Sequence, residues 1–156
     1  GVINPFRDRS GVTLIELIVT MVIMAILAMA VVPLSRVTYK RSKEIELKQD
    51  LRIIREAIDE YKRLVDEEKI PKQAMSSGYP ESLDILVEGV ELQGPVPVKR
   101  KFLRRIPRDP MTEDGEWGLR SYSDEPDSNM WGGQDVYDVY SKSDETALDG
   151  TLYRDW

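Results

Sequence analysis

One carboxylate stands inside a long apolar stretch, and its surroundings suggest the first chemistry for this chain. Residues 12–34 read VTLIELIVTMVIMAILAMAVVPL, and Glu16 is the only ionisable side chain among them. A carboxylate within hydrocarbon costs roughly 3 kcal/mol on insertion scales, so a chain that keeps one there is expected to find a partner cation. Gly11 lies just before the stretch, after the polar segment Arg7-Asp8-Arg9-Ser10. These residues indicate a membrane-held precursor with a processing site.

The composition excludes most hydrolase chemistry. The 156 residues contain no histidine and no cysteine. Zinc sites of the usual His and Cys kinds therefore cannot form, and no histidine can act as a general base. If the folded part of this chain lies outside the cytoplasm, it cannot be stabilised by disulfides, because the chain has no cysteine. Paired acids such as Asp109 and Glu113 could exchange protons, but no nucleophile or pocket signature accompanies them.

A membrane-length helix and its amphipathic continuation must position Glu16. The apolar stretch is long enough to span a bilayer, and the positive residues Arg7 and Arg9 favour the cytoplasmic side. Because proline removes one helix hydrogen bond, we expect a bend or local melting between Met29 and Pro33. After Leu34 the apolar residues recur mostly every three or four residues, which predicts that the helix continues to about Glu68. This stripe consists of Val37, Ile45, Leu47, Leu51, Ile54, Ile58, Tyr61, Leu64 and Val65.

The remaining residues are expected to form a small head that packs against the helix rather than standing alone. A short helix is predicted over residues 80–87, between Pro80 and Gly89. A basic, partly helical segment is predicted at residues 99–105. Alternation predicts strands at residues 117–123 and 136–141, with a turn region around Gly132-Gly133. A short third strand is expected at residues 151–153.

The segment from Gly11 to Leu17, GVTLIEL, resembles the processing motif of type IV pilins and type II secretion pseudopilins. In that family a prepilin peptidase cleaves after the glycine, and the new amino terminus is N-methylated. The resemblance implies cleavage between Gly11 and Val12, Glu16 as the assembly glutamate, and Pro33 at a position where members commonly carry proline. Val12 departs from the phenylalanine or methionine that usually follows the cut. Residues 79–83, 106–110 and 137–156 are similar to the major, G-type pseudopilins.

The resemblance implies a fold and four regions. The fold is α+β and type IV pilin-like, with a long N-terminal helix packed against a small C-terminal antiparallel β-sheet with a loop-rich end. The regions are a prepilin leader (residues 1–11), a hydrophobic transmembrane and assembly helix (12–34), the amphipathic half of the helix (35–69) and a globular α/β head (70–156).

The function that the resemblance implies is structural. After leader cleavage the chain polymerises into a helical pseudopilus that moves folded exoproteins outward, with Glu16 of one subunit paired to the Val12 ammonium of its neighbour. Its other partners are the prepilin peptidase, minor pseudopilins and an inner-membrane assembly platform. Its location is the bacterial inner membrane, as a single-pass protein with the globular domain in the periplasm.

Two other interpretations stay open. One is a type IV pilin for adhesion, motility or DNA uptake, although many true pilins close a C-terminal loop with a disulfide that this chain cannot form. The other is a membrane-anchored binding domain that never polymerises.

The chain is acidic from Met111 onward, where only Arg120, Lys142 and Arg154 are basic. This charge argues against nucleic-acid binding there and leaves room for a hard cation. G-type pseudopilins hold calcium in the loop between their last strands, so the resemblance implies a Ca²⁺ site. The ligands carried over are Ser141, Asp144 and Asp149, followed by Asp124 and Asp135.

One basic cluster precedes the acidic region. DNA-uptake pseudopili belong to the same superfamily, but the cluster lacks interleaved aromatic residues beyond Phe102. We therefore expect a solvated face or a contact with the acids of a neighbouring subunit, and no nucleic acid as a partner. The cluster consists of Lys99, Arg100, Lys101, Arg104, Arg105 and Arg108.

Overall fold

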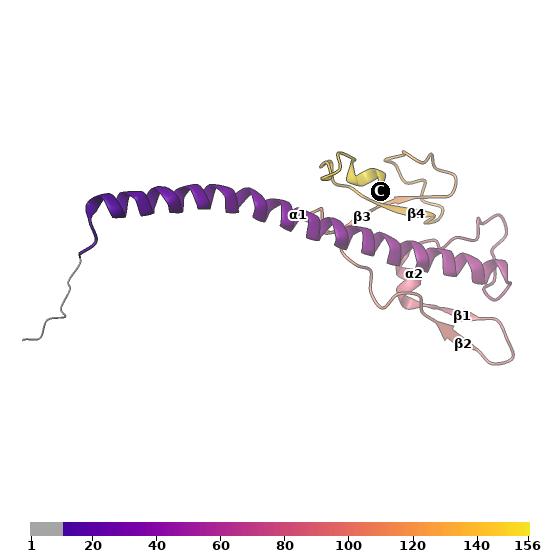
Figure 1. Ribbon diagram of the computed structural model, residues 1–156. Coiled ribbons are helices and arrows are strands. Elements are labelled where there is room, and N and C mark those ends of the chain that lie inside the picture. Colours follow the sequence, from indigo (N-terminus) through magenta and orange to yellow (C-terminus); the bar gives the residue numbers. More distant parts are fainter. Residues whose placement is uncertain (1–10) are drawn as a thin grey trace, which may run out of the picture. The chain divides into compact units, whose positions relative to one another are not determined.

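The computed structural model describes residues 11–156, and these fall into two units that divide between Tyr39 and Lys40. Helix α1, Leu14–Asp66, contributes to both units (Figure 1). Thr13 caps the start of α1, because its Oγ1 accepts a hydrogen bond of 3.2 Å from the Glu16 backbone N–H. Apart from Gly11, the predicted leader lies outside the described residues.

Helix α1 passes through Pro33 without interruption, so the helix does not melt locally between Met29 and Pro33, and the alternative expectation of a bend stays a prediction. A helix can accommodate the fixed φ of proline, and the loss is limited to one backbone hydrogen bond. Two threonines also satisfy their hydroxyls within the helix, since Thr20 Oγ1 donates to the Glu16 carbonyl at 2.7 Å and Thr38 Oγ1 to the Leu34 carbonyl at 3.0 Å.

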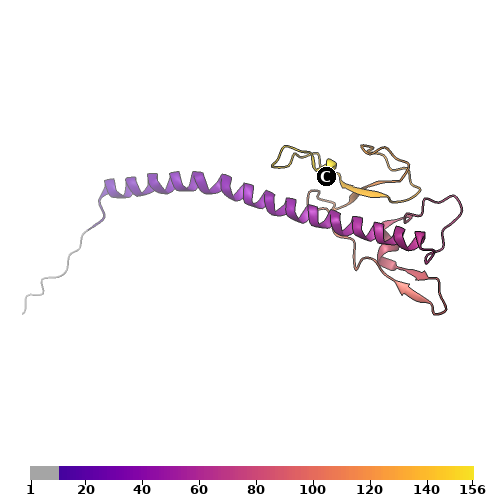
Figure 2. The same ribbon diagram turned by 45° about the vertical axis from the view of Figure 1, so that its right-hand side comes forward.

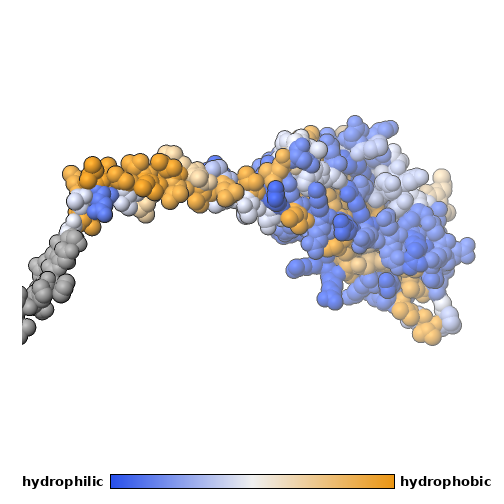
Figure 3. Space-filling view, in the orientation of Figure 1, coloured by the Kyte–Doolittle hydropathy of each residue, from blue (hydrophilic) through white to orange (hydrophobic). Residues whose placement is uncertain are grey.

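The first stretch of α1 leaves its apolar side chains uncovered. The side chains of residues 12–39 are all exposed; Met29, for example, is 75% exposed. Figure 3 shows a nearly continuous hydrophobic surface on this stretch and a mainly hydrophilic surface on the unit Lys40–Trp156. By length and composition, α1 is able to cross a membrane.

The second stretch of α1 forms the spine of the unit Lys40–Trp156. Leu47, Leu51, Ile54 and Ile58 recur at threes and fours and are at most 2% exposed. They share a core with residues of the later elements, namely Leu86, Leu103, Trp117, Val136, Val139 and Tyr153. Ile45 belongs to the predicted stripe but is 61% exposed, because a position two residues before Leu47 lies about 200° around the helix. Val37 is also exposed.

A short helix and a β-hairpin follow α1. Helix α2, Leu83–Glu88, begins three residues later and ends one residue later than expected, and Gly89 caps its end as expected, with φ +86°. Strands β1, Val90–Leu92, and β2, Val98–Arg100, pair antiparallel with Glu91 opposite Lys99. The predicted helical character of residues 99–105 is therefore wrong, because pairing with β1 draws the start of this segment into a strand.

A second antiparallel pair consists of β3, Trp117–Arg120, and β4, Asp138–Ser141, both shorter than expected. Gly118 lies opposite Tyr140, and a Cβ at Gly118 would lie 2.2 Å from the tyrosine ring. The Arg120 guanidinium stacks on the same ring, 4.0 Å from its centre. Figures 1 and 2 both show this pair and the β1–β2 hairpin on opposite sides of α1.

The end of the chain has less β-structure than expected. The predicted third strand is reduced to one bridge between Thr146 and Leu152, followed by the short 3-10 helix η1, Tyr153–Asp155. The α+β class is confirmed, although the strands of the described residues form two two-stranded sheets rather than one small sheet.

Candidate processing and assembly site

The Gly11–Val12 peptide bond lies in non-helical chain directly before α1. Val12 is 63% exposed. Apart from its chain neighbours, no described atom lies within 4 Å of the position that a Gly11 Cβ would take. A protease requires accessible, non-helical backbone, and among the described residues nothing encloses this bond.

Glu16 lies in the first turn of α1. Thr13-Leu14-Ile15-Glu16 matches the capping-box pattern, and the structure forms its threonine half through the Thr13 Oγ1 contact. The positive end of the helix dipole also favours a carboxylate here. Within residues 11–156 this carboxylate has neither an ion pair nor a hydrogen-bond donor, and exposed apolar side chains surround it along the helix. Its charge is thus open to a partner from outside the described chain.

Pro33 lies within the exposed apolar stretch of α1. Because proline has no N–H, the carbonyl of Met29 lacks its usual partner in the helix. No contact of the described residues tests a role for Pro33 in assembly, which stays a prediction.

The three foremost calcium candidates do not converge on one point. The Ser141 hydroxyl donates to Asp109 Oδ2 at 2.7 Å, Asp144 forms an ion pair with Arg154, and Asp149 accepts hydrogen bonds from the turn that follows it. Within residues 11–156, no group of three or more acidic side chains could hold a metal ion. These oxygens are therefore engaged in holding the chain's own turns.

The other two candidates, Asp124 and Asp135, lie in the loop between β3 and β4. Asp124 Oδ2 accepts from the N–H groups of Ser121 and Gly132 at 2.8 and 2.9 Å, and these bonds lower the pKa of its carboxyl. Asp135 accepts from the Tyr122 N–H at 2.8 Å and is almost fully buried. Both acids thus order the loop.

Three oxygens of this loop face the same side of Gly132. A Cβ at Gly132 would lie 2.4 Å from Gln134 Oε1, 2.7 Å from Asp124 Oδ1 and 2.9 Å from Ser121 Oγ. Carboxylate, amide and hydroxyl oxygens are the donors that calcium prefers, so the chemistry of this set fits the ion. The sequence analysis missed Ser121 and Gln134, whose only signal is their place in a loop between strands.

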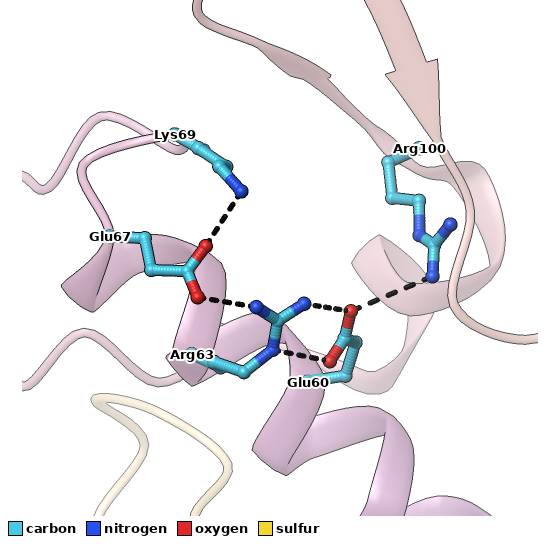
Figure 4. A network of polar contacts seen from close by, with 5 residues as sticks. All are labelled: Glu60, Arg63, Glu67, Lys69 and Arg100. Carbon is cyan, nitrogen blue, oxygen red and sulfur yellow. Dashed lines mark hydrogen bonds and ion pairs between the residues drawn. The ribbon is translucent and has the colours of Figure 1, made fainter.

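A polar network attaches the β1–β2 hairpin to α1 (Figure 4). Arg63 makes a two-pronged contact with Glu60 at 2.7 and 2.9 Å and also pairs with Glu67, which pairs with Lys69 at 2.7 Å. Arg100 of β2 lies 3.6 Å from Glu60. The hydrogen bond from Arg63 lowers the pKa of Glu60. Because these side chains are partly exposed to solvent, the network contributes little to the stability of the fold.

Comparison with known proteins is informative at the N-terminus. The prokaryotic N-terminal methylation motif matches residues 6–32, a range that contains Gly11, Val12 and Glu16 and ends just before Pro33. Neither the curated proteins nor the solved structures contain a match to the chain. The chain therefore carries the methylation motif of type IV pilins and pseudopilins, on an exposed apolar helix that fits a single-pass membrane anchor.

Proposed function

We propose that this chain is a structural subunit of a type II secretion pseudopilus. It inserts in the inner membrane with its globular unit in the periplasm, and a prepilin peptidase cleaves it between Gly11 and Val12. It then polymerises with copies of itself and with minor pseudopilins on an inner-membrane assembly platform. Growth of the filament moves folded exoproteins outward, so the role is mechanical rather than enzymatic.

The observation that carries the proposal is the Glu16 carboxylate, which has no partner among the described residues and stands on an exposed apolar helix. Cleavage would create an ammonium group on Val12, at the matching depth of a neighbouring subunit. Pairing the two groups neutralises both in hydrocarbon, and breaking a buried pair costs about 3–5 kcal/mol. Such a pair favours one docking register between helices.

The exposed apolar side chains of residues 12–34 support the same proposal. A large uncovered apolar surface marks a membrane or protein contact. Lipid would cover this surface before assembly, and neighbouring helices would cover it in the filament, where close packing and ion pairing replace contacts with lipid.

Mass spectrometry of the mature N-terminus tests processing. Protein isolated from its native membrane is expected to begin at a methylated Val12. A native protein that retained residues 1–11 would overturn the proposal.

Cysteine cross-linking tests polymerisation, and the chain has no cysteine of its own to confuse the result. A double variant Ile18→Cys/Met29→Cys in the membrane-bound full chain is expected to give a ladder of covalent multimers under oxidation. Each single variant is expected to stop at dimers. Monomers alone in the double variant would favour an anchored binding domain.

Secretion assays separate the pseudopilus from a type IV pilus. Loss of this chain is expected to strand exoproteins in the periplasm without removing surface fibres. Loss of surface fibres with normal secretion would support the pilin instead.

We also propose that Ca²⁺ binds the β3–β4 loop through Ser121, Asp124 and Gln134. In a soluble fragment beginning at Arg36, 100-fold excess of calcium over its Kd should add about 2.7 kcal/mol of stability. The expected result is a calcium-dependent rise in melting temperature that Asp124→Asn abolishes and Asp149→Asn leaves intact. The reverse pattern would return the site to Ser141, Asp144 and Asp149, and no calcium shift in the parent fragment would overturn it.

A further inference from the structure

The unit Lys40–Trp156 presents an aromatic groove that the proposed function does not yet use. The Tyr79, Tyr122 and Tyr137 rings contact one another with centres 5.0 to 5.7 Å apart. Tyr122 is nevertheless 62% exposed and Tyr137 45% exposed. Tyr79 and Tyr122 line a cavity of about 460 Å³, here called the tyrosine groove. Its polar lining includes Gln73, Ser76, Ser77, Glu81, Gln134 and Asp135.

The tyrosine groove has the character of a peptide site. Tyrosine supplies rigid contact area with a hydrogen-bonding tip and is enriched at protein interfaces. Grooves lined by aromatic rings recognise proline-containing extended segments, whose backbone is already restricted before binding. An occupant with exposed proline and a basic flank would suit both the rings and the acidic Glu81 at the groove.

The same chain exposes such a segment at the turn of the β1–β2 hairpin. The hairpin tip, residues 93–97, contains Pro95-Val96-Pro97 and follows strand β1 directly. All its residues are exposed, with Val96 at 69%. The two prolines fix φ near −65°, so little conformational freedom is lost when the tip binds.

Charge complements the apolar fit. Four exposed cations follow the hairpin tip, and none makes an ion pair with a residue of the described chain: Lys99, Lys101, Arg104 and Arg105. The loop that carries Tyr122 exposes the acids Glu125 and Asp127, which also lack ion pairs within residues 11–156. Basic and acidic surfaces of this kind steer association and set its orientation.

The position of the two surfaces decides what can bind. The hairpin and the β3–β4 pair lie on opposite sides of α1 in Figures 1 and 2, and Tyr122 and Tyr137 flank that pair. No residue of the hairpin tip lines the tyrosine groove of its own copy, so the groove is left for another occupant. A contact between two different patches of identical chains leaves one patch of each kind free, so it propagates from copy to copy into a ring or an open helical array.

We propose that the hairpin tip of one copy docks in the tyrosine groove of the next copy. The inference rests on the proposed filament function and adds a periplasmic contact to the one between apolar helices. The contact is small, and linkage through the helices raises its effective concentration within a filament.

Cross-linking in the membrane-bound full chain tests the contact. Val96→Cys places a thiol in the hairpin tip, and Ala74→Cys places one at the exposed wall of the groove. The double variant is expected to form a multimer ladder, whereas the matched double variant Val96→Cys/Glu113→Cys is expected to form none. A ladder from the control pair, or capture of a different protein by Ala74→Cys, would overturn the inference.

Two substitutions sharpen the test. Tyr122→Ala is added to the Val96→Cys/Ala74→Cys pair, and Val96→Asp is added to a pair that keeps Ala74→Cys. Both change exposed side chains, and each should lower the yield of the multimer ladder about tenfold. Met130→Asp changes another exposed apolar side chain and should leave the yield unchanged. Because Val96→Asp removes the cysteine at position 96, its pair carries the hairpin-tip thiol as Pro95→Cys.

The helix pair Ile18→Cys/Met29→Cys distinguishes the two proposals. Helix ladders without hairpin ladders would refute the groove contact and leave the filament standing. Absence of both ladders would refute both, and hairpin ladders without helix ladders would place the copies together through their globular units alone.

Discussion

The two stretches of α1 expose the same residue type to opposite surroundings. Ile23 and Ile54 are both isoleucines inside the helix, yet Ile23 is 52% exposed and Ile54 is fully buried. Helix formation is common to both, so the difference lies in what covers them. Later elements of the chain pack over Ile54, whereas no described residue covers Ile23. One stretch is covered by its own chain, and in the proposed filament the other is covered by lipid or by neighbouring copies.

Charged side chains repeat this contrast. Arg55, on the packed stretch, lies 2.7 Å from Asp138 Oδ1 and donates to the carbonyls of Val139 at 3.2 Å and Trp156 at 2.7 Å. Glu16, on the uncovered stretch, has no such partner within the described residues. The charge of Arg55 is satisfied within the chain, whereas the charge of Glu16 is left for the partner that the proposed assembly would supply.

The isoleucine pair gives the largest expected effect. Ile54→Ala removes buried methyl groups and should lower the free energy of unfolding of the unit Lys40–Trp156 by about 2–5 kcal/mol. Ile23→Ala should leave that free energy unchanged, because its side chain makes no contribution to this core. Denaturant titration of the full chain in detergent measures both, and equal losses would erase the distinction between the two stretches.

Glu16 gives the next effect, on assembly rather than folding. In the proposed filament, Glu16→Leu removes the charge that sets the register between neighbouring subunits, and a loss of roughly 3 kcal/mol corresponds to about a hundredfold weaker association. Membrane insertion should persist, since the helix becomes more apolar. Glu16→Asp keeps the charge and should retain most assembly, as counted by quantitative cross-linking. Normal assembly of the leucine variant would contradict the ion-pair mechanism.

Substitutions at two glycines test how tightly β3 and β4 pack in the globular unit. Gly118→Ala would place a methyl group against the Tyr140 ring and should destabilise the unit by about 1–3 kcal/mol. Gly94→Ala, in the exposed hairpin tip, meets only one atom at 3.8 Å and should change stability by less than about 0.5 kcal/mol. Thermal melts of the soluble fragment compare them, and indifference to both would mean that β3 and β4 are loosely packed.

The smallest expected effect is the acid sensitivity of the globular unit. Hydrogen bonds from Ser121 and Gly132 hold the pKa of Asp124 below its ordinary value of 3.8. A lowered folded pKa gives stability that is present above the unfolded pKa and is lost as the pH falls through the folded value. The melting temperature should therefore decrease as the pH is lowered below about 4. The decrease should be less steep in Asp124→Asn than in Glu125→Gln. Equal slopes would show that the Asp124 bonds do not contribute.

Elements formed by interactions between residues close in sequence were predictable, and elements that depend on distant residues were not. Helix α1, its buried stripe from Leu47 onward, the Gly89 stop and the β3–β4 pair were predictable, because periodicity and turn residues act over a few positions. The strand at Val98–Arg100 was not, since it depends on pairing with β1. Nor was the exposure of Ile45, which depends on which face the head covers.

The candidate site divides in the same way. Gly11, Val12 and Glu16 stand in one short motif whose spacing is visible in the chain itself. The calcium candidates were chosen as acids of the tail, but the structure engages Ser141, Asp144 and Asp149 in separate contacts. The oxygens of Ser121, Asp124 and Gln134 come together beside Gly132, and their spacing in the sequence does not show this.

The order of residues in the chain was enough to establish a processing motif, a lone acid in a membrane-length helix and an amphipathic spine. Each depends on neighbours within a few turns of helix, where spacing along the chain equals spacing in space. Which oxygens converge in the β3–β4 loop, and which tyrosines form a groove, depended on contacts between distant segments. Those contacts arise from packing around the core, and no local pattern specifies them.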